Sequence, residues 1–476
     1  MADTKITALT ALTAADPAND VIPIVDVSDT SMAASGTTKK ISVNNILGAS
    51  GTATLASATI TGAATVGTTL VVTGKVTANT NIEITRGLLN DGTSTGVGAT
   101  ALAATTAGAT GNTALGYRAM YQATTGANNV AIGNSPLSAA SMTGSGNVAV
   151  GLSALAHLTT GANNIAIGNA AITSSSSPTT GADNVGIGRN AIVNITSGAN
   201  NVAIGLNTMA SSGFISGSNN VGIGNGSLTA VQSASDNIAI GRAAATALVV
   251  GADNVAIGRN SLNTFITGNN CVAIGTTALR DCVVADQTAV GTEALLSLQN
   301  GGNNTAVGRG ALQAVVTTSN NTALGYLAGN ATTGSDTTAI GSNALALSTS
   351  GNGNTAVGSA AMGTSIVTGA ANTCIGAGVG AGLLGGSSNT FIGFDCGYTT
   401  TSGTSNICIG RQAITSTALI SNELSIGSSA QYVATNGGAT TYFATATAGA
   451  VVLGLAQGFI RINLNGTFVK IPVYGN

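Results

Sequence analysis

Residues 252–258 read Ala-Asp-Asn-Val-Ala-Ile-Gly, and this phrase recurs with small changes through most of the chain. Nineteen copies end at glycines from Gly116 to Gly427, which gives a mean spacing of roughly 17.3 residues (311 residues over 18 steps). A repeat of about 17 residues is too short for two packed helices and is typical of one coil of a β-solenoid. The sequence therefore predicts an all-β chain, a parallel β-solenoid of about nineteen coils with a 17-residue period.

Positions in each copy are counted backwards (−) and forwards (+) from the closing glycine. The residues before this glycine are expected to form a strand, whose side chains alternate between two faces. Position −1 is Ile, Val or Leu in every copy, and position −3 is Val, Ile or Thr everywhere except Leu424. These positions share one side of a strand, and their branched side chains predict that this side is buried. Position −2 is Ala in most copies. We expect this flat opposite side to contact another subunit.

Other positions predict the corners of the coil. Position −4 is Asn in most copies, from Asn112 to Asn406, with exceptions at Gln287, Thr337 and Glu423. Stacked asparagines predict a hydrogen-bonded ladder. A second glycine at position −7 predicts a tight turn with positive φ. Leu, Ile or Met at position +4, usually after Ala, predicts a second short strand in each coil.

The composition is typical of a thin rod rather than of a compact enzyme. Charged residues make up 6% of the chain and aromatic residues 3%, with 67 glycines and no tryptophan. A net charge of −2 provides no basic field for nucleic acid. No run of about 20 apolar residues predicts a membrane span, and the N-terminus lacks the pattern of a secretory signal. The five cysteines contain no Cys-x-x-Cys pair and are expected to be small buried residues.

The chain divides into four segments by composition. Residues 1–48, with scattered aspartates and a lysine pair, are expected to form an N-terminal attachment module. Residues 49–111 are a Thr/Ala/Gly-rich β lead-in, and residues 112–427 form the repeat shaft. Residues 428–476 are expected to form a C-terminal β cap or tip.

The last segment is where the sequence predicts recognition of a receptor. It carries six of the fourteen aromatic residues, and Tyr432, Tyr442 and Phe443 are the candidate receptor-binding residues. Strands near 459–464 and 467–473 are predicted to form a β-hairpin. The segment is expected to cap the last coil, to bind a receptor, or to do both.

No residue pattern predicts an enzyme, a cofactor site or a metal site. His157 is the only histidine and is expected to have a surface or packing role. The carboxylates are scattered, with no pair spaced for glycoside hydrolysis. Four aromatic residues lie near copies with glycine at position +4, where they either fill the space of the missing Leu or form a sugar-stacking site: Tyr326, Phe391, Phe394 and Tyr398.

The array Asn-Asn-Val-Ala-Ile-Gly-x-x-Ala-Leu resembles the head domains of trimeric autotransporter adhesins. This resemblance implies a left-handed parallel β-roll that associates as a homotrimer, although the repeat of those heads is shorter. The stretches ITALTALTAADPANDVIPIVDVSDTSMAASGTTKKISVNNILG (residues 6–48) and INLNGTFVKIPVYGN (residues 462–476) resemble the termini of bacteriophage tail-fibre and related structural proteins.

Together the resemblances imply a structural fibre of a phage virion that attaches to the host cell surface. Its expected partners are further copies of itself, other virion proteins bound through the N-terminus, and a glycan or protein of the host surface. The expected location is the virion, after synthesis in the host cytoplasm, and the extracellular space after release. The alternatives are a bacterial surface adhesin or matrix filament, a capsid decoration fibre without receptor binding, and a glycan-degrading tailspike, for which paired carboxylates are scarce.

Overall fold

The computed structural model of the chain describes residues 93–427 except 104–107, 175–177 and 349, and beyond them only the strands β23 (Ala434–Thr435), β24 (Gly458–Leu464) and β25 (Thr467–Val473). These described parts consist of strands and turns, with no helix. The predictions for residues 1–48, and for the lead-in as far as residue 92, lie outside them.

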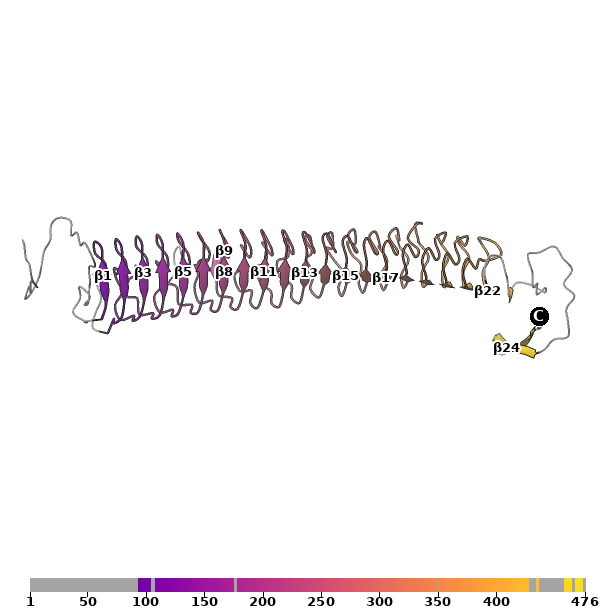
Figure 1. Cartoon of the computed structure of the whole chain (residues 1–476), viewed down its shortest axis with the longest axis horizontal. Helices are drawn as coiled ribbons and strands as arrows, with labels where there is room; N and C mark the ends of the chain where they lie inside the picture. Colours follow the sequence, from indigo (N-terminus) through magenta and orange to yellow (C-terminus); the bar gives the residue numbers. More distant parts are fainter. Residues whose placement is uncertain are drawn as a thin grey trace, which may run out of the picture. The chain divides into compact units, whose positions relative to one another are not determined.

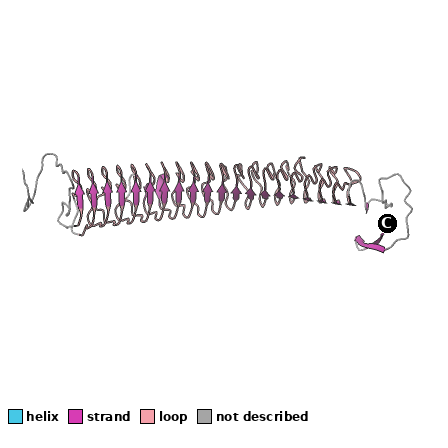
Figure 2. Ribbon diagram, viewed as in Figure 1, coloured by secondary structure: helices cyan, strands magenta, loops and turns pink. Residues whose placement is uncertain are grey.

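Short parallel strands lie one above another along a single stack (Figure 1), and the turns connect each strand to the next (Figure 2). Most are three residues long. The strands of this stack are β1 (Thr95–Val97), β2 (Thr113–Leu115), β3 (Val130–Ile132), β4 (Val148–Val150), β5 (Ile165–Ile167), β6 (Val185–Ile187), β8 (Val202–Ile204), β10 (Val221–Ile223), β11 (Ile238–Ile240), β12 (Val255–Ile257), β13 (Val272–Ile274), β14 (Thr288–Val290), β15 (Thr305–Val307), β16 (Thr322–Leu324), β17 (Thr338–Ile340), β18 (Thr355–Val357), β19 (Thr373–Ile375), β20 (Thr390–Ile392), β21 (Ile407–Ile409) and β22 (Glu423–Ile426).

Neighbouring strands pair in strict register, so that equivalent residues of successive copies lie side by side. For example, Ala256 of β12 pairs with Ala273 of β13. At about 4.8 Å per strand, the stack from β1 to β22 is roughly 90 Å long. The predicted parallel β-solenoid with a period near 17 residues is confirmed. Its first described strand, β1, pairs with β2, so the stack extends at least one coil before residue 112.

The two faces of each strand are arranged opposite to the sequence prediction. The middle residue is buried, whereas the residues on either side of it are half-buried or exposed: in β8, Ala203 is 0% exposed and Ile204 is 37% exposed. The alanines face inward because the opposing turn lies very close to the strand. A Cβ added at Gly186, which holds the same position in β6, would lie 2.5 Å from Cγ1 of Ile172. The predictions of a buried −1/−3 face and of an intersubunit alanine face are therefore wrong.

The segment after the closing glycine forms a turn rather than the predicted second strand. Positions +2 and +4 adopt left-handed backbone conformations, as at Ser153 (φ 54°) and Leu155 (φ 51°), which a strand does not allow. Leu155 is nevertheless fully buried. Strand pairing at this side occurs between β7 (Val193–Ile195) and β9 (Ala210–Ile215).

The glycines that replace Leu at position +4 in three coils adopt the same left-handed backbone conformation. Gly329, Gly380 and Gly397 have φ values of 59°, 62° and 66°, in the region that glycine adopts without steric cost. The loss of the Leu side chain at these positions leaves interior space that a neighbouring residue has to fill. A Cβ at Gly397 would overlap the ring of Phe391, which is fully buried.

The two glycines of each repeat are required for different reasons. The closing glycine Gly258 has a φ of 132°, and a Cβ there would overlap the carbonyl oxygen of Gly275 in the next coil. The glycine at position −7 lacks the predicted positive φ in most coils. At Gly161, for example, a Cβ would overlap the carbonyl oxygen of Gly181. Close approach of successive coils, rather than a left-handed turn, explains this second glycine.

The interior is a continuous core of three rows of side chains. One row is the alanine at position −2, the second is the Ala-Leu pair at positions +3 and +4, and the third is position +7, occupied by Leu158, Phe265 and Leu298 among others. All five cysteines are free and buried, as predicted. The strands of the predicted C-terminal hairpin are also confirmed, because β24 and β25 pair antiparallel.

Candidate functional site

A ladder of asparagine side chains runs along one corner of the stack, as the sequence predicted. Oδ1 of Asn129 accepts hydrogen bonds from the backbone amide of Asn147 (2.8 Å) and from its Nδ2 (3.0 Å). Nδ2 of Asn147 also donates to the carbonyl of Gly161, at 3.1 Å. Each amide therefore joins three coils while remaining out of contact with water. Because water cannot reach these buried amides, breaking a hydrogen bond of the ladder would leave a polar group without a partner. The ladder therefore stabilises the stacking of the coils in register.

Four other residues interrupt or end the ladder. Cys271, which directly precedes β13, is a further exception at position −4: its amide donates to Oδ1 of Asn254 (3.0 Å), while its thiol donates to backbone carbonyls. Gln287 restarts the ladder, since its Oε1 accepts from the amide of Asn304. Thr337 forms a third interruption, with its hydroxyl donating to Oδ1 of Asn321.

Glu423 ends the ladder in the last coil that the structure describes. Its amide donates to Oδ1 of Asn406 (2.9 Å), and its carboxylate accepts from the amide (2.9 Å) and the hydroxyl (2.6 Å) of Ser416. The buried carboxylate thus receives donors from its own coil in place of a following asparagine. Glu423, which replaces asparagine at position −4, therefore terminates the ladder.

Replacement of Asn220 by alanine is expected to lower the free energy of unfolding by roughly 2–4 kcal/mol, measured by urea denaturation followed by circular dichroism. Its side chain accepts from Asn237 and donates to Oδ1 of Asn201 and to the carbonyl of Ala234, all buried. The matched control is Asn225→Ala, because Asn225 is exposed. Equal urea midpoints for the two variants would show that the ladder contributes little stability.

The outer face of the sheet carries an apolar stripe, which we call the outer row: the side chains at positions −1 and −3 of each coil. Ile167 and Ile409 are 40% and 39% exposed, and no outer-row residue is buried in the single chain. The outer row is two residues wide (about 7 Å) and roughly 90 Å long, on the order of 600 Å². From Thr288 to Thr390 position −3 is threonine, so the second half of the outer row mixes hydroxyl and apolar groups.

The aromatic residues of the shaft do not form one site. Phe391 is buried and fills interior space, whereas Tyr326, Phe394 and Tyr398 are 46%, 50% and 45% exposed. Arg309 lies 5.9 Å from the ring centroid of Tyr326, and Arg411 lies 5.9 Å from that of Phe394. Phe394 and Tyr398 share a coil, but Tyr326 lies four coils away, at about 19 Å.

The three candidate receptor-binding residues lie outside the described side chains: Tyr432, Tyr442 and Phe443. The exposed aromatic groups among the described residues are therefore those of the shaft. Arginines lie over four of the shaft's aromatic rings, because Arg118 also lies 5.7 Å from the ring centroid of Tyr117 and 4.9 Å from that of Tyr121.

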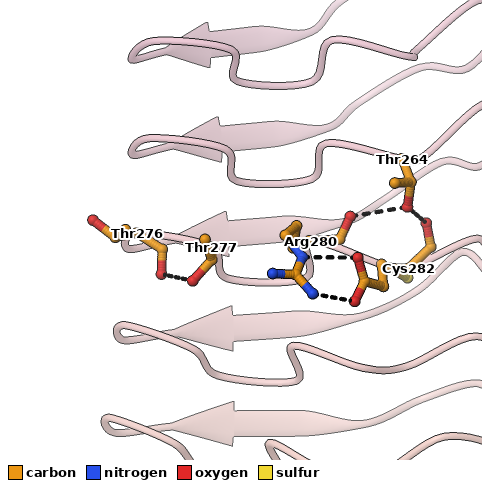
Figure 3. Close-up of polar contacts among 6 residues, drawn as sticks. Thr264, Thr276, Thr277, Arg280 and Cys282 are labelled. Carbon is orange, nitrogen blue, oxygen red and sulfur yellow. Dashed lines mark hydrogen bonds and ion pairs between the residues drawn. The ribbon is translucent and has the colours of Figure 1, made fainter.

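The titratable side chains of the described residues are dispersed. His157 is exposed on a turn, and Oε2 of Glu293 accepts from Nε2 of Gln313 at 3.0 Å. Arg280 and Asp281 form an ion pair at 2.7 Å on the turn after β13 (Figure 3), which raises the pKa of Arg280. Within the described part of the chain, no three His, Cys, Asp or Glu residues are grouped to hold a metal ion.

The cysteines lie in the core of the coils. Burial raises the pKa of the Cys374 thiol, and the hydrogen bond between Cys271 and Cys282, together with burial, raises the pKa of Cys271. Cys271 and Cys374 are therefore neutral thiols that pack as small apolar side chains. The hydrogen bond with Cys271 lowers the pKa of Cys282, and the hydrogen bond with Cys408 lowers the pKa of Cys396.

In the part of the chain that the structure describes, no helix is long and apolar enough to cross a membrane. The sequence matches no protein-family model, and no curated protein sequence is significantly similar to it.

Proposed function

We propose that this chain is the subunit of a homotrimeric fibre, a structural protein of a phage virion whose shaft projects from the particle and attaches it to the host cell. The observation that carries the proposal is the outer row, an apolar stripe as long as the stack that a single chain leaves half-exposed. Such a continuous stripe, on the order of 600 Å², is at the upper end of the apolar patches that soluble monomers expose, and patches of this size often mark interaction sites. Burial against further copies of the same chain is the simplest way to remove it from water.

The narrowness of the outer row favours three copies around one axis. Strands of three residues present a face only two side chains wide, and three such faces directed at a common axis enclose a continuous apolar core. The resemblance to trimeric adhesin heads supports the same number, together with a left-handed coil. The interior of each subunit is already closed by its own alanine and leucine rows, so the subunits would associate as folded coils.

The double variant Ile240→Asp and Ile257→Asp is expected to convert the oligomer into folded monomers. Each carboxylate would be buried unpaired in the proposed interface, at several kcal/mol per subunit, while each is solvated in the single chain. Light scattering coupled to size exclusion gives the mass, and circular dichroism reports the strands. The control is Val250→Asp with Val283→Asp, since these apolar residues are exposed on turns. An Ile240→Asp, Ile257→Asp chain that still assembles would contradict an interface at the outer row.

The other parts of the proposal concern the ends of the fibre. Residues 1–48 would bind other virion proteins, and residues 428–476 would cap the shaft and contact a glycan or protein of the host surface. The protein would act by binding, without catalysis, in the virion and, after release, outside the cell.

Gold-labelled antibodies against the shaft test the location of the protein in electron micrographs of a culture that produces it. Label on phage tails supports the proposal. Label on capsids would indicate a decoration fibre, and label on bacterial envelopes would indicate a surface adhesin.

A further inference from the structure

Two rows of charged side chains border the outer row, one at each end of the strands. Position −5 forms the acidic edge, where the left-handed backbone (φ near 60°) suits Asp and Asn. Position +1 forms the basic edge. The charged residues of these edges are all exposed: Asp183, Asp236, Asp253, Asp286 and Asp336 on the acidic edge, and Arg189, Arg242, Arg259, Arg309 and Arg411 on the basic edge.

Three coils carry both charges at once, and within one chain these charges do not meet. The pairs are Asp183 with Arg189, Asp236 with Arg242, and Asp253 with Arg259. The two residues of each pair are six positions apart along the chain, with a whole strand between them, which corresponds to a distance of up to about 20 Å. The only ion pair among the described residues joins Arg280 and Asp281 on a turn (Figure 3). The charges of the two edges are therefore unpaired with each other in a single chain.

Cyclic assembly about an axis along the stack would bring opposite edges together. All strands of the stack from β1 to β22 run in the same direction. If the outer rows of parallel copies face a common axis, the end of each strand points toward the start of the equivalent strand in the next copy. The basic edge of one copy then lies beside the acidic edge of its neighbour at the same coil.

The outer row alone does not fix how far one copy is shifted along another. Within each half of the outer row the side chains are nearly the same in successive coils, so a shift by one coil matches like with like in most coils, with exceptions such as the step from Val272 to Thr288. The charges differ from coil to coil. In register, all three arginines meet an aspartate. A shift by one coil leaves one match in one direction, Arg242 with Asp253, and two in the other, Arg259 with Asp236 and Arg309 with Asp286. Exposed charge pairs contribute more to register and specificity than to affinity.

We infer that Arg189, Arg242 and Arg259 pair with Asp183, Asp236 and Asp253 of a neighbouring copy of this chain, and that these pairs hold the copies parallel and in register. This inference rests on the proposed oligomeric fibre and adds its geometry. The partner is a second copy because each charged coil supplies both the arginine and the complementary aspartate.

The test is cross-linking between engineered cysteines with a short bismaleimide, which bridges thiols that are too far apart for a disulfide. The variant Asp236→Cys with Arg242→Cys is expected to give covalent oligomers on a denaturing gel. The matched control, Asp183→Cys with Arg242→Cys, places the two thiols three coils apart and is expected to give only monomers. The five native cysteines are buried and provide a low background in the folded protein.

Charge reversal tests the role of the pairs themselves. Arg189→Glu, Arg242→Glu and Arg259→Glu together are expected to lower the cross-linking yield several-fold, measured between cysteines on the outer row, as in Ile204→Cys. Adding Asp183→Arg, Asp236→Arg and Asp253→Arg, which exchanges the two edges, is expected to restore it.

Three outcomes separate this inference from the proposal on which it rests. Cross-links in the matched-coil variant alone, with rescue by the exchanged edges, support the inference. If the protein sediments as an oligomer but the displaced control cross-links equally well, the inference is overturned and the oligomeric fibre is not. The same holds if charge reversal leaves the cross-linking yield unchanged. A monomer by sedimentation overturns both.

Discussion

Replacement of Ala256 by aspartate is expected to unfold the coil around β12 rather than to separate subunits. Ala256 is 1% exposed and faces the interior of its own coil. A carboxylate there would be buried without a partner, at about 3–5 kcal/mol, in a space that accommodates only a methyl group. We expect a lower urea midpoint and a loss of strand signal in circular dichroism.

The adjacent residue supplies the control for Ala256→Asp. Ile257 lies on the outer row, and Ile257→Asp is expected to retain the strand signal while weakening assembly. If instead Ala256→Asp gave folded monomers and Ile257→Asp unfolded the chain, the strand would face the opposite way, with isoleucine inside.

Replacement of Gly258 by alanine is expected to destabilise the stack by at least about 3 kcal/mol. Two effects combine at this residue: its φ of 132° is unfavourable for a side chain, and the added Cβ would overlap the carbonyl oxygen of Gly275. The backbone amide of Gly275 donates to the carbonyl of Ile257 in the same region, so a shift of the coils would also strain this ladder. Thermal unfolding followed by circular dichroism measures the effect.

Gly226 provides the comparison for Gly258. It has a positive φ of 69°, but a Cβ there would meet no atom within 4 Å. Gly226→Ala is expected to cost only about 1 kcal/mol, from the backbone conformation alone. Equal losses in the two variants would indicate that the close approach of successive coils is unimportant.

The repeat in the sequence was sufficient to predict the solenoid, its period and the asparagine ladder, because each depends on one residue type recurring at one spacing. The faces of the strand were predicted the wrong way round for a physical reason. Ala203 and Ile204 are both apolar, and alternation shows only that they face opposite sides. The deciding quantity is the width of the coil, which leaves room for a methyl group but not for a branched side chain next to the turn.

The turn after the closing glycine could not be predicted from local preferences. Leu155 and its equivalents adopt a left-handed conformation that costs a non-glycine residue about 1 kcal/mol, and burial of the Leu side chain compensates for it. The charged edges had a visible signal, the string Asp-Asn-Val-Ala-Ile-Gly-Arg at residues 253–259. Its meaning depends on strand direction and exposure, which required the structure.

The mass and shape of the purified chain, measured by light scattering combined with sedimentation velocity, test directly whether the protein is a trimeric fibre. An elongated trimer of three 45.6 kDa chains, with a mass of about 137 kDa and the outer rows buried, is expected. A particle of 45.6 kDa at micromolar concentration would contradict it, because the outer row would then be a stable water-exposed face of a monomer.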